Sequence, residues 1–299
     1  MTAPRLAPPR PATLRLAAAG LAALLIVGGC AGSALPSLAA GSPQAQDSSG
    51  PEASVPLAAD SVSTYRAYLV TNADLLVART KPFVDAIVAG KVAQAKALYA
   101  AAHEPYERIE PVADVFGDLD PAIDEAESDV TAGATFGGFH RLEKALWQAN
   151  TTTGMTPIAK KLLTDVTQLQ ALVKTVDLDP ATIANGAVGV LNDISSSKTS
   201  GTEERYSHTD VWDIEANVNG VQAAWTAVKP LVVTRAAALA SSIDDGLTAL
   251  QAALQPFQKG SGWVAFSTLT PADTQAIGAL VDALADPLSQ VAAIVVSAQ

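Results

Sequence analysis

LTPADTQAIGALVDALADPLSQVAAIVV, residues 269–296, is the stretch that decides the fold class of this chain. Its large apolar residues recur at steps of three and four, and they are Ile277, Leu280, Val281, Leu284, Leu288, Val291 and Val295. That spacing places them on one face of an α-helix. Thr270 followed by Pro271 is typical of a helix start, because threonine caps a first turn and proline is tolerated at the first helical position. The stretch therefore predicts an amphipathic helix over residues 272–297.

Helical spacing recurs along most of the chain, and no segment alternates apolar and polar residues with the period of two that indicates a strand. Gly90 separates two helical patterns, while Asp179-Pro180 and Thr156-Pro157 repeat the start signal. Short connections between successive helices favour antiparallel packing, so we predict an all-α fold, a helical bundle. The expected helices lie near residues 60–78, 81–89, 91–115, 121–130, 135–149, 157–175, 180–197, 208–228, 231–255 and 272–297.

The first 29 residues have the composition of an export signal. Three arginines and no acids flank an apolar run over residues 16–27, which is shorter than the roughly 20 residues of a membrane-spanning helix. Val27-Gly28-Gly29-Cys30 follows, a pattern typical of bacterial lipoproteins, in which the cysteine is lipidated after cleavage. Cys30 is the only cysteine and cannot form an internal disulfide. We predict a lipoprotein signal peptide over 1–29 and lipidation of Cys30. The alternative is an ordinary secretory signal with a chance cysteine.

Residues 30–56 are rich in Ser, Ala, Pro and Gly, and we expect a flexible tether there. Residues 57–299 are enough for one domain with a sizeable core. Cleavage after residue 29 removes three arginines and no acid, so the net charge falls from −11 to −14. Such an acidic chain is not expected to bind nucleic acid, whose phosphates require a basic surface. The charge suits cations, although solubility alone would also explain it.

A histidine and a glutamate stand three residues apart in Gly137–Trp147, GGFHRLEKALW. His140 and Glu143 share one helical face at this spacing and could bind one cation together. Histidine is rare in this chain, with 3 in 299 residues, so its place among acidic segments is informative. The pair alone is weak evidence for a metal site, because a single histidine is more often a packed or exposed residue than a ligand.

Acidic residues lie on both sides of this pair. Upstream, Glu107 and Glu110 are three residues apart and Asp124 lies within the next expected helix, while Glu203 and Glu204 precede a later one. Metal sites in helical bundles are built from carboxylates and histidines that project inward from facing helices. Carboxylate and imidazole ligands suit iron, manganese or zinc, and the near absence of cysteine and methionine argues against a Cu(I) site.

Each of these residues also has an ordinary structural interpretation. Glu107 and Glu110 could lie on a solvated helix face, and Glu204 could form a local ion pair with Arg205. We expect His103 to be a solvated helix residue. Composition and spacing therefore leave a metal site and a set of surface charges equally open.

Four segments together resemble one known family. Residues 105–124, 136–147, 204–220 and 269–293 are similar to blocks of the imelysin-like EfeO/EfeM lipoproteins of bacterial iron uptake. The resemblance extends from about residue 60 to the C-terminus and implies a helical bundle. It also implies a metal site at an HxxE motif with nearby acids. The implied site residues are His140, Glu143, Glu107, Glu110, Asp124 and Glu204.

The sequence departs from the family pattern in two places. His103 stands where we expect an arginine of the family, and it could add a ligand or merely change a surface charge. Many EfeO proteins also carry an N-terminal cupredoxin domain, which is linked to a second metal site and to redox handling. We expect no such domain here, and therefore no oxidation step by this chain alone.

The resemblance implies a membrane-tethered protein of the cell envelope, on the outer face of the cytoplasmic membrane or in the periplasm. It would bind Fe²⁺ or Fe³⁺ and deliver it to an iron permease that works with a haem peroxidase; zinc and manganese are the other candidate cations. We expect no enzymatic activity. One alternative is a metallopeptidase of the imelysin type, although the HExxH motif is absent from the sequence. The other is a polysaccharide-binding or structural envelope lipoprotein.

Overall fold

The computed structural model describes residues 54–297, with side chains described from residue 57. The predicted signal peptide over 1–29, Cys30 and the tether up to residue 53 lie outside the described residues. The predictions made for them stay predictions.

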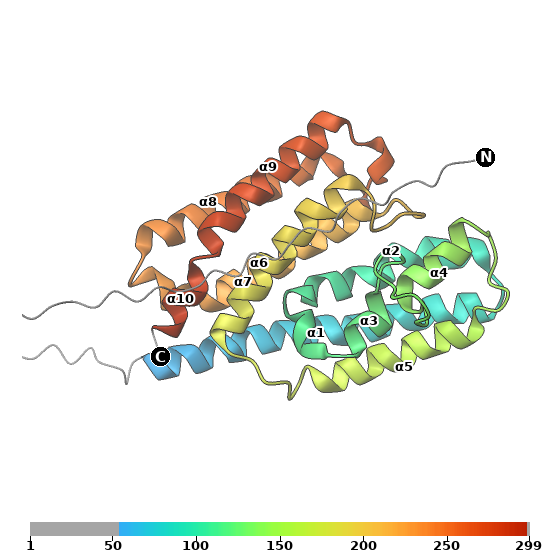
Figure 1. The fold of residues 1–299 in the computed structure, drawn as a ribbon, viewed down its shortest axis with the longest axis horizontal. Coiled ribbons are helices and arrows are strands. Elements are labelled where there is room, and N and C mark those ends of the chain that lie inside the picture. Colours follow the sequence, from blue (N-terminus) through green and yellow to red (C-terminus); the bar gives the residue numbers. More distant parts are fainter. Residues whose placement is uncertain (1–53, 298–299) are drawn as a thin grey trace, which may run out of the picture. The chain divides into compact units, whose positions relative to one another are not determined.

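The described part of the chain is built almost entirely from helices, which confirms the all-α prediction (Figure 1). Two short strands, β1 (Gln258–Lys259) and β2 (Gly262–Trp263), pair as an antiparallel hairpin. The α-helices are α1 (Ser54–Val88), α2 (Val92–Ile109), α3 (Leu119–Asp124), α4 (Gly138–Trp147), α5 (Thr156–Leu172), α6 (Pro180–Ser196), α7 (Asp210–Val233), α8 (Ala237–Leu254), α9 (Pro271–Leu288) and α10 (Val291–Val296). The 3-10 helices are η2 (Glu110–Phe116), η3 (Lys198–Ser200), η4 (Gln255–Phe257) and η5 (Phe266–Thr268).

Two groups of helices pack on a shared pair, α6 and α7 (Figure 1). In the first group, α1 packs on α2 and α5, and the short helices α3 and α4 contact each other and α5. In the second group, α8 and α9 pack on each other and α10 contacts α6. Helix α7 contacts α1, α2, α6 and α8, and the buried apolar residues of the two groups form one continuous core. Helices α6 and α7 therefore hold the first group next to residues 197–209, which connect α6 to α7.

The stretch 269–296 folds as two helices rather than the single predicted helix. Thr270 and Asp273 form a capping box at the start of α9, as the start signal predicts. At the other end, the Ser289 hydroxyl donates to the Asp286 carbonyl at 2.7 Å. That carbonyl would otherwise accept the next amide of the helix, so the serine side chain competes with the helical ladder. The chain therefore leaves α9 there and forms α10.

The two other start signals have different outcomes. Asp179 caps α6 as predicted, since its carboxylate accepts the backbone N–H groups of Ala181 and Thr182 at 2.8 and 2.9 Å. Thr156 does not cap α5. It lies inside that helix, and the residue at the N-cap position is Met155, whose side chain makes no capping hydrogen bond. A proline at the first turn therefore located both helix starts, but the capping side chain is present in only one.

The break predicted between residues 78 and 81 is wrong, because α1 runs without interruption through Pro82. Leu76, Thr80 and Phe83 are all fully buried and continue one helical face across the proline. Proline removes a single backbone hydrogen bond from a helix interior, and packing of the neighbouring turns offsets that loss. The break at Gly90 is confirmed, since α1 ends at Val88 and α2 starts at Val92.

The helix predicted over 91–115 is α-helical only as far as Ile109, and η2 continues it. Pro111 has no N–H to donate to the carbonyl of Glu107. Asn217 of α7 donates to this carbonyl instead, with 2.8 Å between Nδ2 and O. The end of α2 is therefore fixed to α7 at the level of Glu107.

The helix predicted over 121–130 is also shorter than expected. Helix α3 ends at Asp124, and the next residue, Glu125, has the extended ψ of 120°. Most of the residues that follow up to the start of α4 are polar or small, and the two large apolar ones, Val130 and Phe136, do not have a spacing that would continue a helix. Asp124 is therefore the last residue of its helix and not an interior one.

Helix α4 begins very close to the end of α3, and glycine makes this approach possible. Gly138 has a φ of +65°, and a Cβ atom at this position would lie 2.2 Å from the carbonyl oxygen of Ile123. Glycine alone adopts this φ without strain and leaves space for that carbonyl. The first turn of α4, with His140, is thereby held next to Asp124.

Candidate metal centre

Titratable side chains from separate segments meet between α2, α3, α4 and the start of α7. Their imidazole nitrogens and carboxylate oxygens form three overlapping trios, and within each trio the atoms lie within 4.8 Å of one another. Most of these residues are buried. We call the set the histidine cluster, and its members are His103, Asp124, His140, Glu143, Glu204 and Asp213.

His103 is the central residue of this cluster, and the expectation that it is solvated is wrong, since its exposed fraction is 0%. Its Nε2 lies 2.5 Å from Oδ1 of Asp124 and 3.2 Å from Oε1 of Glu107. Its Nδ1 lies 3.1 Å from Oε1 of Glu204. The ring packs on Phe139, with 4.6 Å between the ring centroids. Each ring nitrogen of His103 therefore faces at least one carboxylate.

The HxxE pair of α4 points into the same cluster. His140 lies 3.5 Å from a carboxylate oxygen at each ring nitrogen, namely Oε2 of Glu143 at Nδ1 and Oδ1 of Asp124 at Nε2. The other carboxylate oxygen of Glu143 accepts the backbone N–H groups of Tyr206 and Ser207 at 2.8 and 2.7 Å. These two donors fix the orientation of Glu143, so that its second oxygen faces the imidazole.

Glu204 is a fully buried member of the cluster and not a loop acid paired with Arg205. Its Oε1 accepts the hydroxyl of Tyr99 at 2.9 Å, and its Oε2 accepts the hydroxyl of Ser207 at 2.5 Å. Burial alone would raise the pKa of this carboxyl group, but the hydrogen bond with His103 and the nearby His140 lower its pKa to about 2. Glu204 is therefore ionised at any physiological pH.

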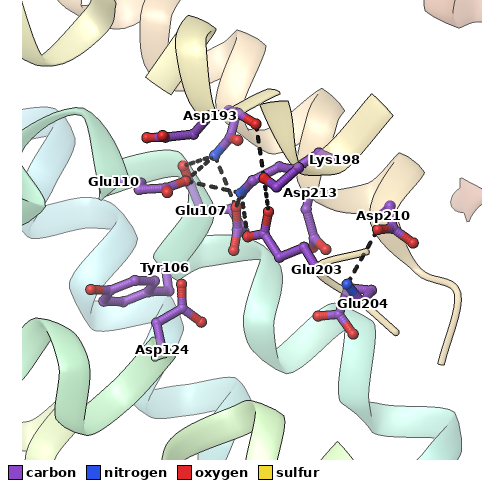
Figure 2. Close-up of polar contacts among 12 residues, drawn as sticks. Tyr106, Glu107, Glu110, Asp124, Asp193, Lys198, Glu203, Glu204, Asp210 and Asp213 are labelled. Carbon is purple, nitrogen blue, oxygen red and sulfur yellow. Dashed lines mark hydrogen bonds and ion pairs between the residues drawn. The ribbon is translucent and has the colours of Figure 1, made fainter. Parts of the chain in front are cut away.

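A second cluster, built around an amine, adjoins the first (Figure 2). The ammonium of Lys198, from η3, contacts the carboxylates of Glu107, Glu110 and Glu203. The side-chain amide of Asn217 donates to Oε2 of Glu107 at 2.9 Å and to Oε2 of Glu110 at 2.6 Å. We call these five residues the lysine cluster.

Glu107 joins the two clusters. It is 0% exposed, so the interpretation as a solvated helix face does not hold for this residue, whereas Glu110 is partly exposed. One carboxylate oxygen of Glu107, Oε2, binds Lys198 and Asn217, and the other, Oε1, is turned towards His103. A cation that binds in either cluster therefore changes the electrostatic environment of the other cluster through Glu107.

Burial and neighbouring carboxylates oppose each other in setting the pKa values of the two histidines. Burial lowers the pKa of an imidazole, but Asp124 and Glu107 raise the pKa of His103 well above its usual 6.5. For His140, burial again lowers the pKa, while Glu143 and Glu204 raise it to about 9. The carboxylates therefore favour the protonated form of both imidazoles, and a cation that binds to them must displace those protons.

Several buried polar atoms of this region have no hydrogen-bond partner. They include both ring nitrogens of His140, both carboxylate oxygens of Asp213 and Oε1 of Glu107. An unpaired polar atom in a protein interior costs roughly 1–3 kcal/mol, and a bound cation would give several of these atoms a partner. Imidazole nitrogens and carboxylate oxygens together suit iron, manganese and zinc. The residues of the histidine cluster therefore fit a bound transition-metal cation.

All six site residues implied by the family resemblance lie in this region, but they divide between the two clusters. His140, Glu143, Asp124 and Glu204 belong to the histidine cluster, Glu110 belongs to the lysine cluster, and Glu107 joins them. The sequence interpretation left His103 open as an added ligand or a surface charge, and it assigned no site role to Asp213, Asn217 or Lys198. A local signal existed in two segments: residues 103 and 107 of α2 with residue 110 of η2, and residues 210, 213 and 217 of α7, recur at steps of three and four.

Two cavities lead to the clusters from the surface. One, of about 250 Å³, is lined by His140 and Glu143 together with Tyr206 and Glu127. The other, of about 470 Å³, is strongly acidic, and its lining includes the carboxylates Glu110, Asp120, Asp124, Glu125, Asp129, Asp193 and Glu203. A cleft lined by one sign of charge raises the local concentration of oppositely charged ions. Both cavities offer a cation a route to the buried side chains.

A sequence model of the imelysin family, which is labelled as a peptidase family, matches residues 61–291. The EfeO proteins of Escherichia coli K12, Shigella flexneri and Shigella sonnei, each described as an iron uptake system component, are 40% identical to this chain over 232 residues. The match covers 77% of this chain and 62% of each relative, so the chain spans less than two thirds of their length. Because the family match extends over most of the chain, this protein belongs to the imelysin family.

Proposed function

We propose that this protein binds iron outside the cytoplasm as a component of a bacterial iron uptake system. The histidine cluster is the observation that carries this proposal, since two imidazoles and four carboxylates converge there with several polar atoms unpartnered. His140 and Glu143 of this cluster form the HxxE motif. The description of the EfeO relatives as iron uptake system components supports the same role.

The two ligand types have different tasks in this proposal. The carboxylates neutralise the charge of Fe²⁺ or Fe³⁺ and replace part of its water shell. The imidazoles of His103 and His140 favour transition metals over Ca²⁺ and Mg²⁺, which prefer oxygen ligands alone. Zinc and manganese accept the same ligands, so supply of the metal, as well as affinity, decides which cation is carried.

The depth of the cluster favours binding over hydrolysis. A hydrolytic metal keeps one position open for water and substrate. His103, His140 and Glu143 are only 0%, 2% and 1% exposed, and the cavity beside the HxxE pair has about 250 Å³. That space admits a hydrated cation but not a polypeptide strand with its side chains. We therefore infer a binding protein and not a peptidase.

The N-terminal residues supply the location in this proposal. A lipid on Cys30 and a tether over residues 30–56 would hold the domain at the membrane surface. Tethering raises the local concentration of a carrier near a membrane transporter. The partners that we propose are an iron permease and the haem peroxidase of the same uptake system.

Calorimetric titration of the purified protein with Fe²⁺, Fe³⁺, Zn²⁺ and Mn²⁺ tests the proposal. We expect at least one iron species to bind tightly, and His140→Ala to weaken binding by about 100-fold, as the loss of a ligand or its support does. The matched control is His208→Ala. His208 is the third histidine, is exposed and lies outside both clusters, so this change should leave the affinity unaltered.

Two results would contradict the proposal. In the first, no cation binds tightly, or His140→Ala binds as well as the unaltered protein. In the second, the zinc-loaded protein hydrolyses peptides with repeated turnover, and Glu143→Gln abolishes that activity while the protein stays folded. The second result would establish the peptidase instead.

A further inference from the structure

Lys198 is the one cation inside the acidic region that the proposed iron binding does not use, among the residues that the structure describes. Its exposed fraction is 0%. Lysine is almost never fully buried unless its charge is paired. Here the pairing is unusually complete, because the ammonium has three N–H donors and contacts three separate carboxylates.

The three carboxylates around Lys198 have the spacing of a metal site. Ligand oxygens of Glu107, Glu110 and Glu203 lie within 4.8 Å of one another. The ammonium contacts Glu107, and it lies 3.1 Å from Oε2 of Glu110 and 2.9 Å from Oε1 of Glu203. An ammonium is a compact point charge, and in this position it takes the place of a bound cation.

Several acidic side chains lie around the ammonium (Figure 2). Besides its three direct partners, Asp213 from α7, Asp193 from α6 and Asp124 from α3 act on this group or on its carboxylates. Burial and repulsion between the carboxylates raise the pKa of Glu107, Glu203 and Asp213, so one ammonium does not offset the excess of acidic groups. A divalent cation would compensate that excess better than the ammonium does.

Glu107 ties this position to the histidine cluster. Its Oε2 is held by Lys198 and by Asn217, so its Oε1 is turned towards His103, 3.2 Å from Nε2. This oxygen is buried and has no hydrogen-bond partner. The ammonium thus fills one position of the centre and also holds the shared carboxylate in place for the other.

We propose that Lys198 is a built-in competitor for metal ions: its ammonium occupies a second cation position between Glu107, Glu110 and Glu203, and a metal ion can enter this position only by displacing it. This inference rests on the proposed binding of a cation at the histidine cluster. The tethered ammonium keeps the three carboxylates together in the metal-free protein. It also lowers the affinity of this position for metal. An ion bound here is therefore released more readily than it would be from the same three carboxylates without the lysine.

Replacement of the lysine by an uncharged side chain of similar length tests the proposal. The unaltered protein and Lys198→Met are titrated with Zn²⁺, which does not change oxidation state. The amount of bound metal is measured by elemental mass spectrometry. We expect Lys198→Met to bind more Zn²⁺ than the unaltered protein does, or to bind it with about tenfold higher affinity. The double variant Lys198→Met/Glu110→Gln should lose that gain, because one of the three carboxylates is removed.

A matched control separates this effect from a general change of charge. Lys229→Met also removes one positive charge, but Lys229 is partly exposed and pairs with Asp244 at 2.7 Å on α8. It should bind Zn²⁺ like the unaltered protein. In Lys198→Met/His140→Ala the additional Zn²⁺ should remain, because its ligands are the carboxylates of the lysine cluster.

Thermal melting covers the case in which Lys198→Met is unstable without metal. Zn²⁺ should then raise the melting temperature of Lys198→Met by more than that of the unaltered protein, since a ligand stabilises the state to which it binds. If Lys198→Met neither binds more Zn²⁺ nor is stabilised more by it, while the unaltered protein binds as proposed, Lys198 is no competitor and only this inference fails. If neither protein binds any cation, the proposed function fails together with it.

Discussion

The histidine cluster and the lysine cluster bury the same kind of acid but neutralise it with different cations. In the lysine cluster, an amine contacts the carboxylates, and burial, which lowers its pKa, is outweighed by Glu107 and Glu110, which raise it well above its usual value. In the histidine cluster, two imidazoles are the cations, and His140 has a pKa of about 9. A metal can displace the proton of an imidazole with this pKa, whereas the amine keeps its proton and its charge. A metal can therefore replace protons in one cluster, but must displace a whole side chain in the other.

The two clusters also differ in how many of their polar atoms are hydrogen-bonded. In the lysine cluster, Oε2 of Glu107 and Oε2 of Glu110 each accept from both Lys198 and Asn217. In the histidine cluster, both nitrogens of His140 and both oxygens of Asp213 are unpartnered. The oxygens that face the amine are satisfied by residues of the lysine cluster, whereas the histidine cluster has more ligand atoms without a partner.

Lys198→Met should cause the largest loss of stability in the metal-free protein. Removal of one partner from a buried ion pair leaves uncompensated charge, which costs about 3–5 kcal/mol. We expect the free energy of unfolding, measured by urea titration with a chelator present, to fall by that amount. A loss below about 1 kcal/mol, the range of surface pairs, would show that the lysine cluster does not depend on its amine.

His103→Gln should have the largest effect on metal binding. The change removes the central imidazole while it keeps a polar side chain of similar size, and we expect the affinity for Fe²⁺ or Zn²⁺ to fall by about 100-fold, close to 3 kcal/mol. His208→Gln is the control, because it makes the same change at an exposed histidine. Equal affinities of the two variants in a calorimetric titration would remove His103 from the site.

The fold was predictable from the sequence because apolar spacing is a local property. The prediction failed where a contact with a distant part of the chain decides where a helix ends. The spacing around Ile277 and Val281 located α9 correctly. The end of α2, in contrast, depends on Asn217, which takes the place of the N–H that Pro111 lacks. These residues are far apart in the sequence, and no pattern near Pro111 indicates a donor from another helix.

The candidate site was predictable to the same limited degree. His140 and Glu143 are visible as a local pair, and the acids of the neighbouring segments could be collected around them. Lys198 could not be found in this way, because its partner Glu107 lies 91 residues away in the sequence and nothing around Lys198 marks it as buried. His103 had a local signal, its spacing of four from Glu107, which an expectation of solvent exposure obscured.

Acidity should act oppositely on the metal-free and the metal-bound protein. His140 has a folded pKa of about 9, above the usual 6.5 of an unfolded chain. Its contribution to the stability of the metal-free protein is therefore complete below about pH 6.5 and is lost as the pH rises through 9. Metal binding displaces the same proton, so the affinity should rise with pH, by about tenfold per unit for each proton displaced.

The measurement is a pair of melting curves between pH 6 and 9, with a chelator and with Zn²⁺. The melting temperature with the chelator should fall over this range, and the difference made by Zn²⁺ should grow. Parallel curves would mean that no buried imidazole exchanges its proton for the metal. In Lys198→Met both pH dependences should keep their sign. The amine of the unaltered protein does not titrate between pH 6 and 9, so it contributes nothing to either of them.

Lys229→Met should have the smallest effect and shows what burial contributes. Lys229 and Asp244 form an ion pair at 2.7 Å, yet their side chains are 39% and 40% exposed. Water screens such a pair, and its loss costs about 1 kcal/mol or less. Urea titration of Lys229→Met beside Lys198→Met therefore compares one kind of contact in two surroundings. If both variants lose the same stability, the ion pairing of a lysine, and not its burial among three carboxylates, explains the result, and the division between the two clusters loses its energetic basis.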